Sequence, residues 1–290
     1  MFGIAFNYQF YYVGLSMGFI DSIQNLIGDK DKNKDFISKF PNKVGSYGYD
    51  AWGFNLKGIE PFVEAGRFFY EKYFRVETYG LENIPKDGRV LIIANHSGQL
   101  PIDAILLGYA LITNQYSPRV PKGMYERFIP TIPFFSSLFS SWGGTLGDPE
   151  NCIKMLENDE AVMVFPEGAR GIAKPTKLKY QLQRFGNGYI YMAVKTKTPI
   201  IPVGIVGCEE ILINYGNIDF ISKLIKAPSF PTLFPFVFPS KVIMHFGEPI
   251  YFEGDIGREH IMEDMNKQVK SAVKELINEG LKKRKGIFSK

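Results

Sequence analysis

The sequence predicts an α/β fold, with a mainly parallel sheet flanked by helices and an apolar N-terminal appendage. Two observations carry this prediction. Short apolar runs bounded by turn residues alternate with longer segments of helical periodicity, which is the pattern of strand–helix–strand units. Several of the runs are continuous rather than alternating, as in strands that are buried on both faces of a sheet. The 290 residues, 45% of them hydrophobic, are enough for one large core and exclude a dominantly disordered chain.

The first expected element beyond the N-terminal region is an amphipathic helix at 59–74, where apolar residues recur every three or four positions between charges. A short strand at 75–79 and turn residues at 80–88 precede the apolar run Val90–Ala94, which we expect to be a fully buried strand. The later expected elements are a helix after Asp103, a helix after Pro149, a strand at 161–165, a helix at 189–195, strands at 200–206 and 241–246, and a closing helix at 258–285. The apolar face expected for that closing helix comprises Ile261, Met265, Val269, Val273, Leu276 and Leu281.

The N-terminal region differs from the rest of the chain. Residues 1–20 contain no charged side chain, and their apolar residues fall on one face of a helix. Polar interruptions leave three alternatives open: a membrane span, an interfacial helix, or a helix packed on the core. The mixed-charge run at 29–35 (DKDKNKD) predicts a solvated linker. We therefore expect an apolar helix and linker at 1–35 and a single domain at 36–290.

Composition excludes several classes of protein. The two cysteines, Cys152 and Cys208, form no CxxC pair, and with three histidines in the chain we expect no metal site and no disulfide framework. A net charge of +4 without a nucleic-acid-binding signature gives no reason to expect nucleic acid as a partner. The aromatic fraction of 15% is high for an ordinary cytosolic domain.

Two expected strands end in polar motifs. NHSGQLPID follows the first buried strand and contains His96 and Asp103; a carboxylate so placed can hold one imidazole nitrogen and leave the other free as a base. FPEGAR follows the strand at 161–165 and brings Glu167 and Arg170 to the rim of the sheet. Taken singly, the first motif is equally compatible with a structural histidine, and the second with a surface ion pair.

A third motif, GGTLGDP at 143–149, lies between these two. Its glycines predict a turn that opens a helix, and such a turn can present backbone N–H groups to an anion. The alternative is an ordinary helix cap, with Asp148 at the N-cap and Pro149 in the first turn.

With these motifs in this order, the sequence resembles the glycerolipid acyltransferases, typified by 1-acylglycerol-3-phosphate acyltransferase. The matching blocks are NHSGQLPID, GGTLGDP, FPEGAR and TPIIPVGIVG, and the resemblance covers roughly residues 45 to 255. It implies a glycerol-3-phosphate acyltransferase-like fold. It also implies transfer of a fatty acyl group from an acyl-CoA or acyl-carrier-protein thioester to a glycerolipid hydroxyl, with no cofactor and no acyl-enzyme.

The resemblance also implies roles for individual residues. His96 would be the general base and Asp103 its orienting partner. The residues implied in substrate binding are Glu167, Gly168 and Arg170 around the acceptor, Gly144 and Thr145 lining its site, and Pro202 supporting the acyl-donor side.

The sequence departs from the family pattern in two respects. Six residues separate His96 from Asp103 where the family commonly has four, so the extra backbone must bulge if the pair is to meet. The second block lacks the arginine that phosphate-accepting relatives often carry and has Asp148 close by. A neutral acceptor, a mono- or diacylglycerol, is therefore an alternative to a lysophospholipid.

Aromatic residues and proline concentrate at 128–142 and 229–238, and basic residues border these stretches, among them Lys122. Core or loop packing is one interpretation. The other is an apolar rim at a lipid surface, which predicts a membrane-associated protein on the cytoplasmic face, with membrane lipid and the acyl thioester as partners. The rival to the enzyme is a non-catalytic, membrane-associated lipid-binding protein that retains the fold.

Overall fold

The computed structural model describes residues 45, 47–97, 100–125, 139–217, 231–233, 237–254 and 256–289. The expected helix and linker at 1–35 and most of the aromatic stretches at 128–142 and 229–238 lie outside these residues. Within them, no helix is both long enough and apolar enough to cross a bilayer.

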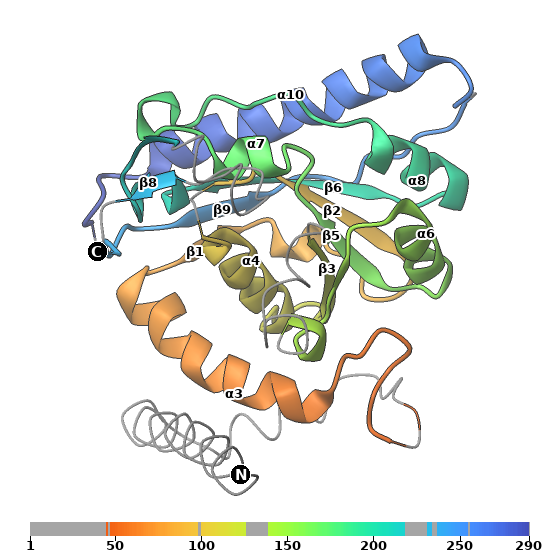
Figure 1. Cartoon of the computed structure of the whole chain (residues 1–290), viewed down its shortest axis with the longest axis horizontal. Coiled ribbons are helices and arrows are strands. Elements are labelled where there is room, and N and C mark those ends of the chain that lie inside the picture. Colours follow the sequence, from red (N-terminus) through yellow and green to blue (C-terminus); the bar gives the residue numbers. More distant parts are fainter. Residues whose placement is uncertain are drawn as a thin grey trace, which may run out of the picture.

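A seven-stranded sheet forms the centre of the molecule (Figure 1). Its strand order is β1-β9-β6-β2-β5-β3-β4, and the described strands pair in parallel except for β6 with β9, which are antiparallel. The prediction of a mainly parallel sheet is thus confirmed. The strands are β1 (Glu77–Tyr79), β2 (Val90–Ala94), β3 (Pro121–Tyr125), β4 (Gly144–Leu146), β5 (Ala161–Val164), β6 (Ile200–Val206) and β9 (Ile243–Phe246); a separate pair is made by β7 (Asn214–Asn217) and β8 (Pro231–Leu233).

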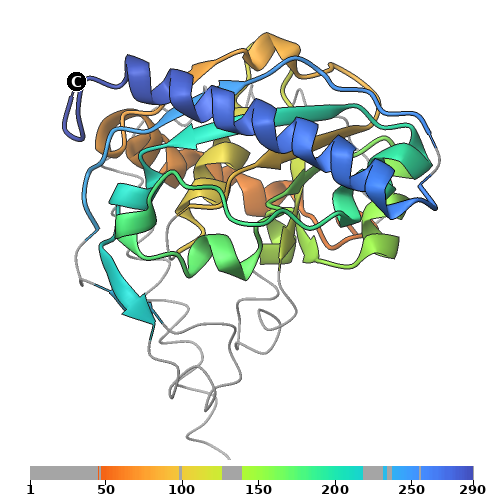
Figure 2. The same cartoon turned by 90° about the horizontal axis from the view of Figure 1, so that it is seen from above.

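Helices cover both faces of the sheet (Figures 1 and 2). One face carries α6 (Pro149–Glu157), α8 (Gly188–Thr196) and the long α10 (Glu259–Lys283), and the other carries α4 (Ile102–Ile112), against which α3 (Leu56–Arg67) packs. The short helical segments are the π-helix η1 (Phe68–Tyr73), α7 (Ala169–Ile172), and the 3₁₀ turns η2 (Leu81–Asn83), η4 (Thr176–Leu178) and η5 (Cys208–Glu210). The expected helix at 59–74 is therefore present as α3 continued by η1.

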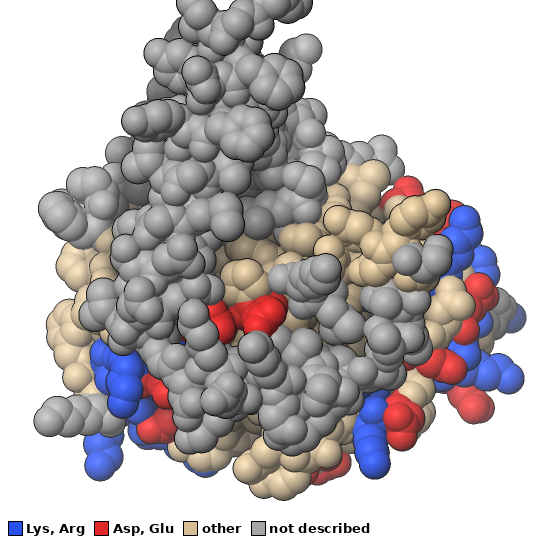
Figure 3. Space-filling model, turned by 90° about the horizontal axis from the view of Figure 1, so that it is seen from below, with Lys and Arg blue, Asp and Glu red and all other residues tan. Residues whose placement is uncertain are grey.

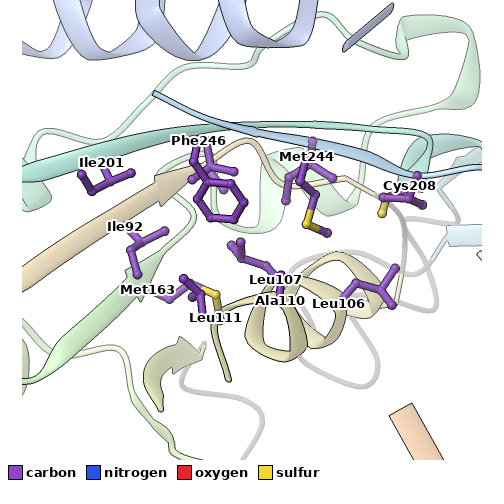
Figure 4. Packing of buried hydrophobic residues seen from close by; sticks show 14 of the residues in the cluster. Ile92, Leu106, Leu107, Ala110, Leu111, Met163, Ile201, Cys208, Met244 and Phe246 are labelled. Atoms are coloured by element: carbon purple, nitrogen blue, oxygen red, sulfur yellow. The ribbon is translucent and has the colours of Figure 1, made fainter. Parts of the chain in front are cut away.

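Alternation along the strands builds the two cores. In β2, Ile92 points towards α4, whereas Leu91 and Ile93 point to the opposite face. Figure 4 shows Ile92, Met163 and Ile201 from three neighbouring strands converging on Leu107 and Leu111 of α4. Each fully buried aliphatic side chain of this kind contributes about 1.5–3 kcal/mol, so both faces of the central strands stabilise the sheet.

The strand at the outer edge of the sheet was not predicted from the sequence. Gly144–Leu146, which we expected to be a turn, is the edge strand β4, paired in parallel with β3. The alternative interpretation of the motif is confirmed, because Asp148 is the N-cap of α6, its side chain accepts from the Glu150 N–H, and Pro149 lies in the first turn. The turn therefore caps a helix.

The closing helix is present, but its expected face is wrong at one end. Val269 and Val273 are fully buried as expected, and Ile277 continues the buried row. Leu281 is 37% exposed. The buried position in the last turn is Gly280, which lies against Val206 and leaves no room for a side chain. Close approach of helix and strand, which hydrophobicity does not encode, moves the face by one residue.

Candidate active site

The central feature of the site is a contact between His96 and Asp103. β2 ends at Ala94, and Asp103 lies in the first turn of α4, so the intervening loop must fold back for the two to meet. They do meet: His96 Nδ1 lies 2.7 Å from Asp103 Oδ2. Six intervening residues, two more than the common family spacing, are therefore compatible with the pair.

Asp103 is completely buried, and its charge is satisfied locally. Besides the imidazole, Oδ2 accepts from the Ser97 N–H at 2.7 Å and Oδ1 accepts from the Ala104 N–H at 2.8 Å. These donors stabilise the ionised carboxylate, which favours the tautomer in which Nδ1–H of His96 donates to it. The Nε2 atom of His96 then carries the free lone pair.

Glu167 contacts the main chain of His96. This side chain is 1% exposed; its Oε1 accepts from the His96 N–H at 3.0 Å and its Oε2 from the Gln183 N–H at 2.7 Å. The carboxylate is thus occupied by main-chain donors from two segments. It fixes the main chain of His96, which is a different role from contacting an acceptor directly.

Two residues that the sequence did not single out also touch His96. The ring of Phe165, directly after β5, stacks on the imidazole with centroids 4.4 Å apart. Gly171 in α7 packs so closely that a Cβ atom there would lie 2.8 Å from the Cβ of His96. Gly168, at φ 56°, makes the turn that brings α7 to this position and requires glycine. One signal in the sequence could have identified Gly171: it follows Gly168 by three residues, directly after the strand-end motif FPEGAR.

Arg170 lies at the exposed rim of the site, and it has a neighbour that sequence reasoning missed. Its Nη2 lies 3.4 Å from the main-chain oxygen of Arg184, which is also exposed. Between Glu167 and Glu209, every charged residue in the sequence is a lysine or an arginine. Lys174 in this run is buried against Glu209 and Lys179 pairs with Glu210, so the cations at this rim are Arg170 and Arg184, which would attract a phosphate or another anion.

Comparison with known proteins fits this geometry. The model of the Acyltransferase family matches residues 75–206, which include the His96, Glu167 and Pro202 blocks. An uncharacterized protein of Mycobacterium tuberculosis is 32% identical over 263 residues, covering 84% of this chain and 73% of that protein. The chain belongs to the acyltransferase family. The resemblance predicted from the four blocks is confirmed, and so is the prediction of an acyltransferase enzyme.

Two further relatives extend the comparison. A human protein named DGAT1/2-independent enzyme synthesizing storage lipids is 25% identical over 234 residues, covering 80% of this chain and 69% of that protein. The crystal structure of the 1-acyl-sn-glycerophosphate acyltransferase PlsC from Thermotoga maritima matches with a TM-score of 0.55 and 22% identity, covering 97% of this chain and 95% of that one. The acyltransferase therefore shares its fold with PlsC.

Three of the expected substrate-binding residues are not adjacent to His96. β4, with Gly144 and Thr145, is separated from β2 by β5 and β3, which places it about 14 Å to the side. Pro202 of β6 is buried on the α10 side of the sheet, where Gly247 packs on it, whereas His96 lies on the α4 side. Thr145 Oγ1 is buried and has no hydrogen-bond partner within the described part of the chain.

Both cysteines are buried and free. Burial raises the pKa of the Cys152 thiol to about 12 and raises that of Cys208 well above its usual value. Neither thiol ionises near neutral pH, so neither is a nucleophile for acyl transfer. Across the described ranges, no group of three or more His, Cys, Asp or Glu side chains could hold a metal ion.

The interpretation of Lys122 as a surface cation is wrong. Its side chain is 3% exposed, and its ammonium group forms an ion pair with Asp50 and lies 4.7 Å from the centroid of the Phe54 ring. Lys122 therefore joins the segment before α3 to β3, and it is not available to attract anionic lipid.

Proposed function

We propose that this acyltransferase moves a fatty acyl group from an acyl-CoA or acyl-carrier-protein thioester to a glycerolipid hydroxyl, with His96 as general base. The observation that carries this proposal is the 2.7 Å contact of His96 Nδ1 with the buried Asp103, which leaves Nε2 free at the carboxyl ends of β2 and β5. Ligands of open α/β sheets bind at these ends. The names of the human and Thermotoga relatives support a glycerolipid acceptor.

The reaction follows from these groups. Nε2 takes the proton of the acceptor hydroxyl as its oxygen attacks the thioester carbonyl, and Asp103 stabilises the imidazolium that forms. The tetrahedral intermediate collapses with cleavage of the C–S bond, and the imidazolium returns the proton to the leaving sulfur. A positioned base contributes about 10²- to 10⁴-fold, and holding both substrates together supplies much of the remainder. No cofactor enters these steps.

The acceptor is either a lysophospholipid or a mono- or diacylglycerol. Arg170 and Arg184 at the rim favour a phosphate-bearing substrate, because guanidinium groups bind phosphate with strong charge-assisted hydrogen bonds. The name of the human relative favours a neutral acceptor. Product identification decides between them: the purified full chain is given radiolabelled acyl-CoA, or acyl-carrier protein, with lysophosphatidate, monoacylglycerol and diacylglycerol in parallel.

The same experiment tests the non-catalytic rival. Formation of an acylated glycerolipid with any acceptor supports the enzyme. Lipid binding without product from either donor would favour the lipid-binding protein that retains the fold.

We also propose that the protein works at a membrane surface on the cytoplasmic face. η1 presents Phe68 and Phe69, which are 41% and 44% exposed, and Phe288 near the C-terminal end is 65% exposed. Aromatic side chains favour the boundary between water and lipid. Figure 3 shows acidic and basic side chains interspersed on the described part of the face that it presents. Sedimentation with anionic and neutral liposomes tests this, and absence of binding to both would overturn it.

A further inference from the structure

A second buried ion pair lies close to the base, and the reaction described above does not use it. Lys174 Nζ lies 2.9 Å from Glu209 Oε1, and the two side chains are 3% and 5% exposed. Lys174 follows α7, and Glu209 belongs to η5 just beyond β6. The pair therefore joins the segment that carries Arg170 and Gly171 to the end of a central strand.

Both members of this pair also hold the main chain of one loop. Glu209 Oε2 accepts from the Tyr180 N–H at 2.7 Å, and Lys174 Nζ donates to the Gln181 oxygen at 3.1 Å. The main-chain groups of two consecutive residues, Tyr180 and Gln181, are thus held by opposite charges, and the loop cannot shift without breaking a charge-assisted hydrogen bond.

The same loop reaches the base two residues later. The Gln183 N–H donates to Glu167 Oε2, and the His96 N–H donates to Oε1 of that carboxylate. Burial raises the pKa of Glu209, Lys174 opposes the rise, and Glu167 adds to it, so the two carboxylates are within electrostatic reach of each other. A continuous chain of contacts runs from Lys174 and Glu209 through the loop and Glu167 to His96.

We propose that Lys174 and Glu209 are positioning residues for the transferase reaction: their ion pair sets the place of the 180–183 loop, and thereby of Glu167 and the main chain of His96. The proposal rests on the role of His96 as base given above. A misplacement of about 1 Å in a reacting group can lower the rate by about 10²-fold, so small movements transmitted along this chain have large kinetic consequences.

The molecule contains a matched control. Lys122 and Asp50 also form a buried pair, with exposed fractions of 3% and 7%, and Asp50 likewise accepts from main-chain N–H groups, those of Trp52 and Phe54. β3, which carries Lys122, is two strands away from β2. The two pairs share burial and chemistry and differ in whether the held segment contacts Glu167.

The test removes each pair as a whole, since removing one charge would leave the other buried and unpaired. The double variants are Lys174→Met with Glu209→Leu, and Lys122→Met with Asp50→Leu. For the first we expect kcat to fall between about tenfold and 100-fold, KM to change less than twofold, and amide hydrogen exchange to accelerate at His96 as well as in the 180–183 loop. For the second we expect wild-type kcat and wild-type exchange at His96.

Wild-type kcat in the first double variant would overturn the proposal. An equal fall of kcat in the two double variants would also overturn it, because that result would indicate a general loosening of the protein's packing. If the first variant does not fold, Glu209→Gln replaces it. Its single amide oxygen can serve Tyr180 or Lys174 but not both, so kcat should still fall at unchanged KM, with wild-type kcat again overturning the proposal. A wild-type protein that transfers no acyl group to any acceptor would contradict the proposed function, whereas an active wild type with an unaffected variant contradicts only this inference.

Discussion

The carboxyl ends of β2 and β5, at the centre of the sheet, and β3, next to the edge strand β4, both have buried carboxylates that bind main-chain groups, but for different purposes. In both regions a buried carboxylate accepts main-chain N–H groups: Asp103 and Glu167 at the centre, Asp50 at the edge. At the edge Asp50 is paired with Lys122, whose ammonium group can only donate hydrogen bonds. At the centre Asp103 is paired with an imidazole, which can gain and lose a proton. The comparison teaches that buried charge alone does not mark the site; a titratable partner with one free nitrogen does.

The largest effect on catalysis is expected from substitutions in the His96–Asp103 pair. His96→Ala removes the base, and Asp103→Asn removes the charge that stabilises the imidazolium, so kcat should fall about 10²- to 10⁴-fold in each. Radiolabelled acyl transfer by purified variants measures this. A near-normal rate in either variant would show that the mutated residue has no part in the mechanism. The distinction drawn above between the His96–Asp103 pair and the Lys122–Asp50 pair would then fail.

A smaller effect is expected from Gly171→Ala. The added Cβ would lie 2.8 Å from the Cβ of His96 and 2.9 Å from that of Glu167, so the base must move. We expect kcat to fall at least about tenfold, because reactivity depends steeply on the position of the base. Gly188→Ala is the control, since a Cβ there meets nothing within 4 Å. Equal activity of the two variants would contradict the close packing at His96.

Arg170→Gln tests the rim of the central region. If the acceptor carries a phosphate, loss of a charge-assisted hydrogen bond should raise KM for lysophosphatidate about tenfold or more and leave monoacylglycerol transfer unchanged. Arg184→Gln should act in the same direction. Lys195→Gln is the control, an exposed cation on α8. Equal KM changes for charged and neutral acceptors would show that Arg170 does not select for phosphate.

At the outer edge, Lys122→Met should destabilise the protein without changing catalysis. Removing one member of a buried ion pair leaves Asp50 unpaired, at a cost of about 3–5 kcal/mol. Chemical denaturation measures the free energy of unfolding, and kcat is measured where the variant is folded. A fall in kcat comparable to that of Gly171→Ala would mean that the edge is coupled to the base.

The smallest effect concerns His245, a buried imidazole on β9 whose ring nitrogens have no hydrogen-bond partner in the described part of the chain. Burial, and then the charge of Lys283, lower its pKa from 6.5. The unfolded state therefore binds the proton more tightly, and stability decreases as pH falls through 6.5. Melting temperatures at neutral and mildly acidic pH should differ more for the wild type than for His245→Met. An equal decrease of melting temperature in the wild type and in His245→Met would show that other groups cause the pH dependence.

Much of the fold was predictable because it depends on local patterns. The apolar run Val90–Ala94 is β2 in the structure with the same ends, and the periodicity at 59–74 gave α3 and η1. β4 was not predictable, since glycine and threonine at an edge carry no strand pattern and the strand exists only through pairing with β3. The antiparallel direction of β9 relative to β6 was not predictable either, because it depends on pairing with a strand far away in the sequence.

The candidate site was predictable where chemistry and strand ends coincide, and less so elsewhere. His96 and Asp103 meet as the motif suggested, although the loop length argued against it. Glu167 was predicted at the acceptor site, whereas the structure shows it buried with main-chain N–H partners, which no side-chain motif reveals. Gly171, Phe165 and Arg184 become neighbours of the site only when the segments after β5 fold against it.

The pairing of β1 has a consequence for how the molecule is made. Among the described strands, β1 pairs with β9 alone, and β9 also covers the open side of β6. On a ribosome, which releases about 5–20 residues per second, β1 must wait many seconds for a partner that is more than 160 positions downstream. Until then one edge of β6 offers unpaired N–H and C=O groups to any other strand in reach. The newborn chain is therefore most vulnerable to misassociation in the interval between the synthesis of β6 and that of β9.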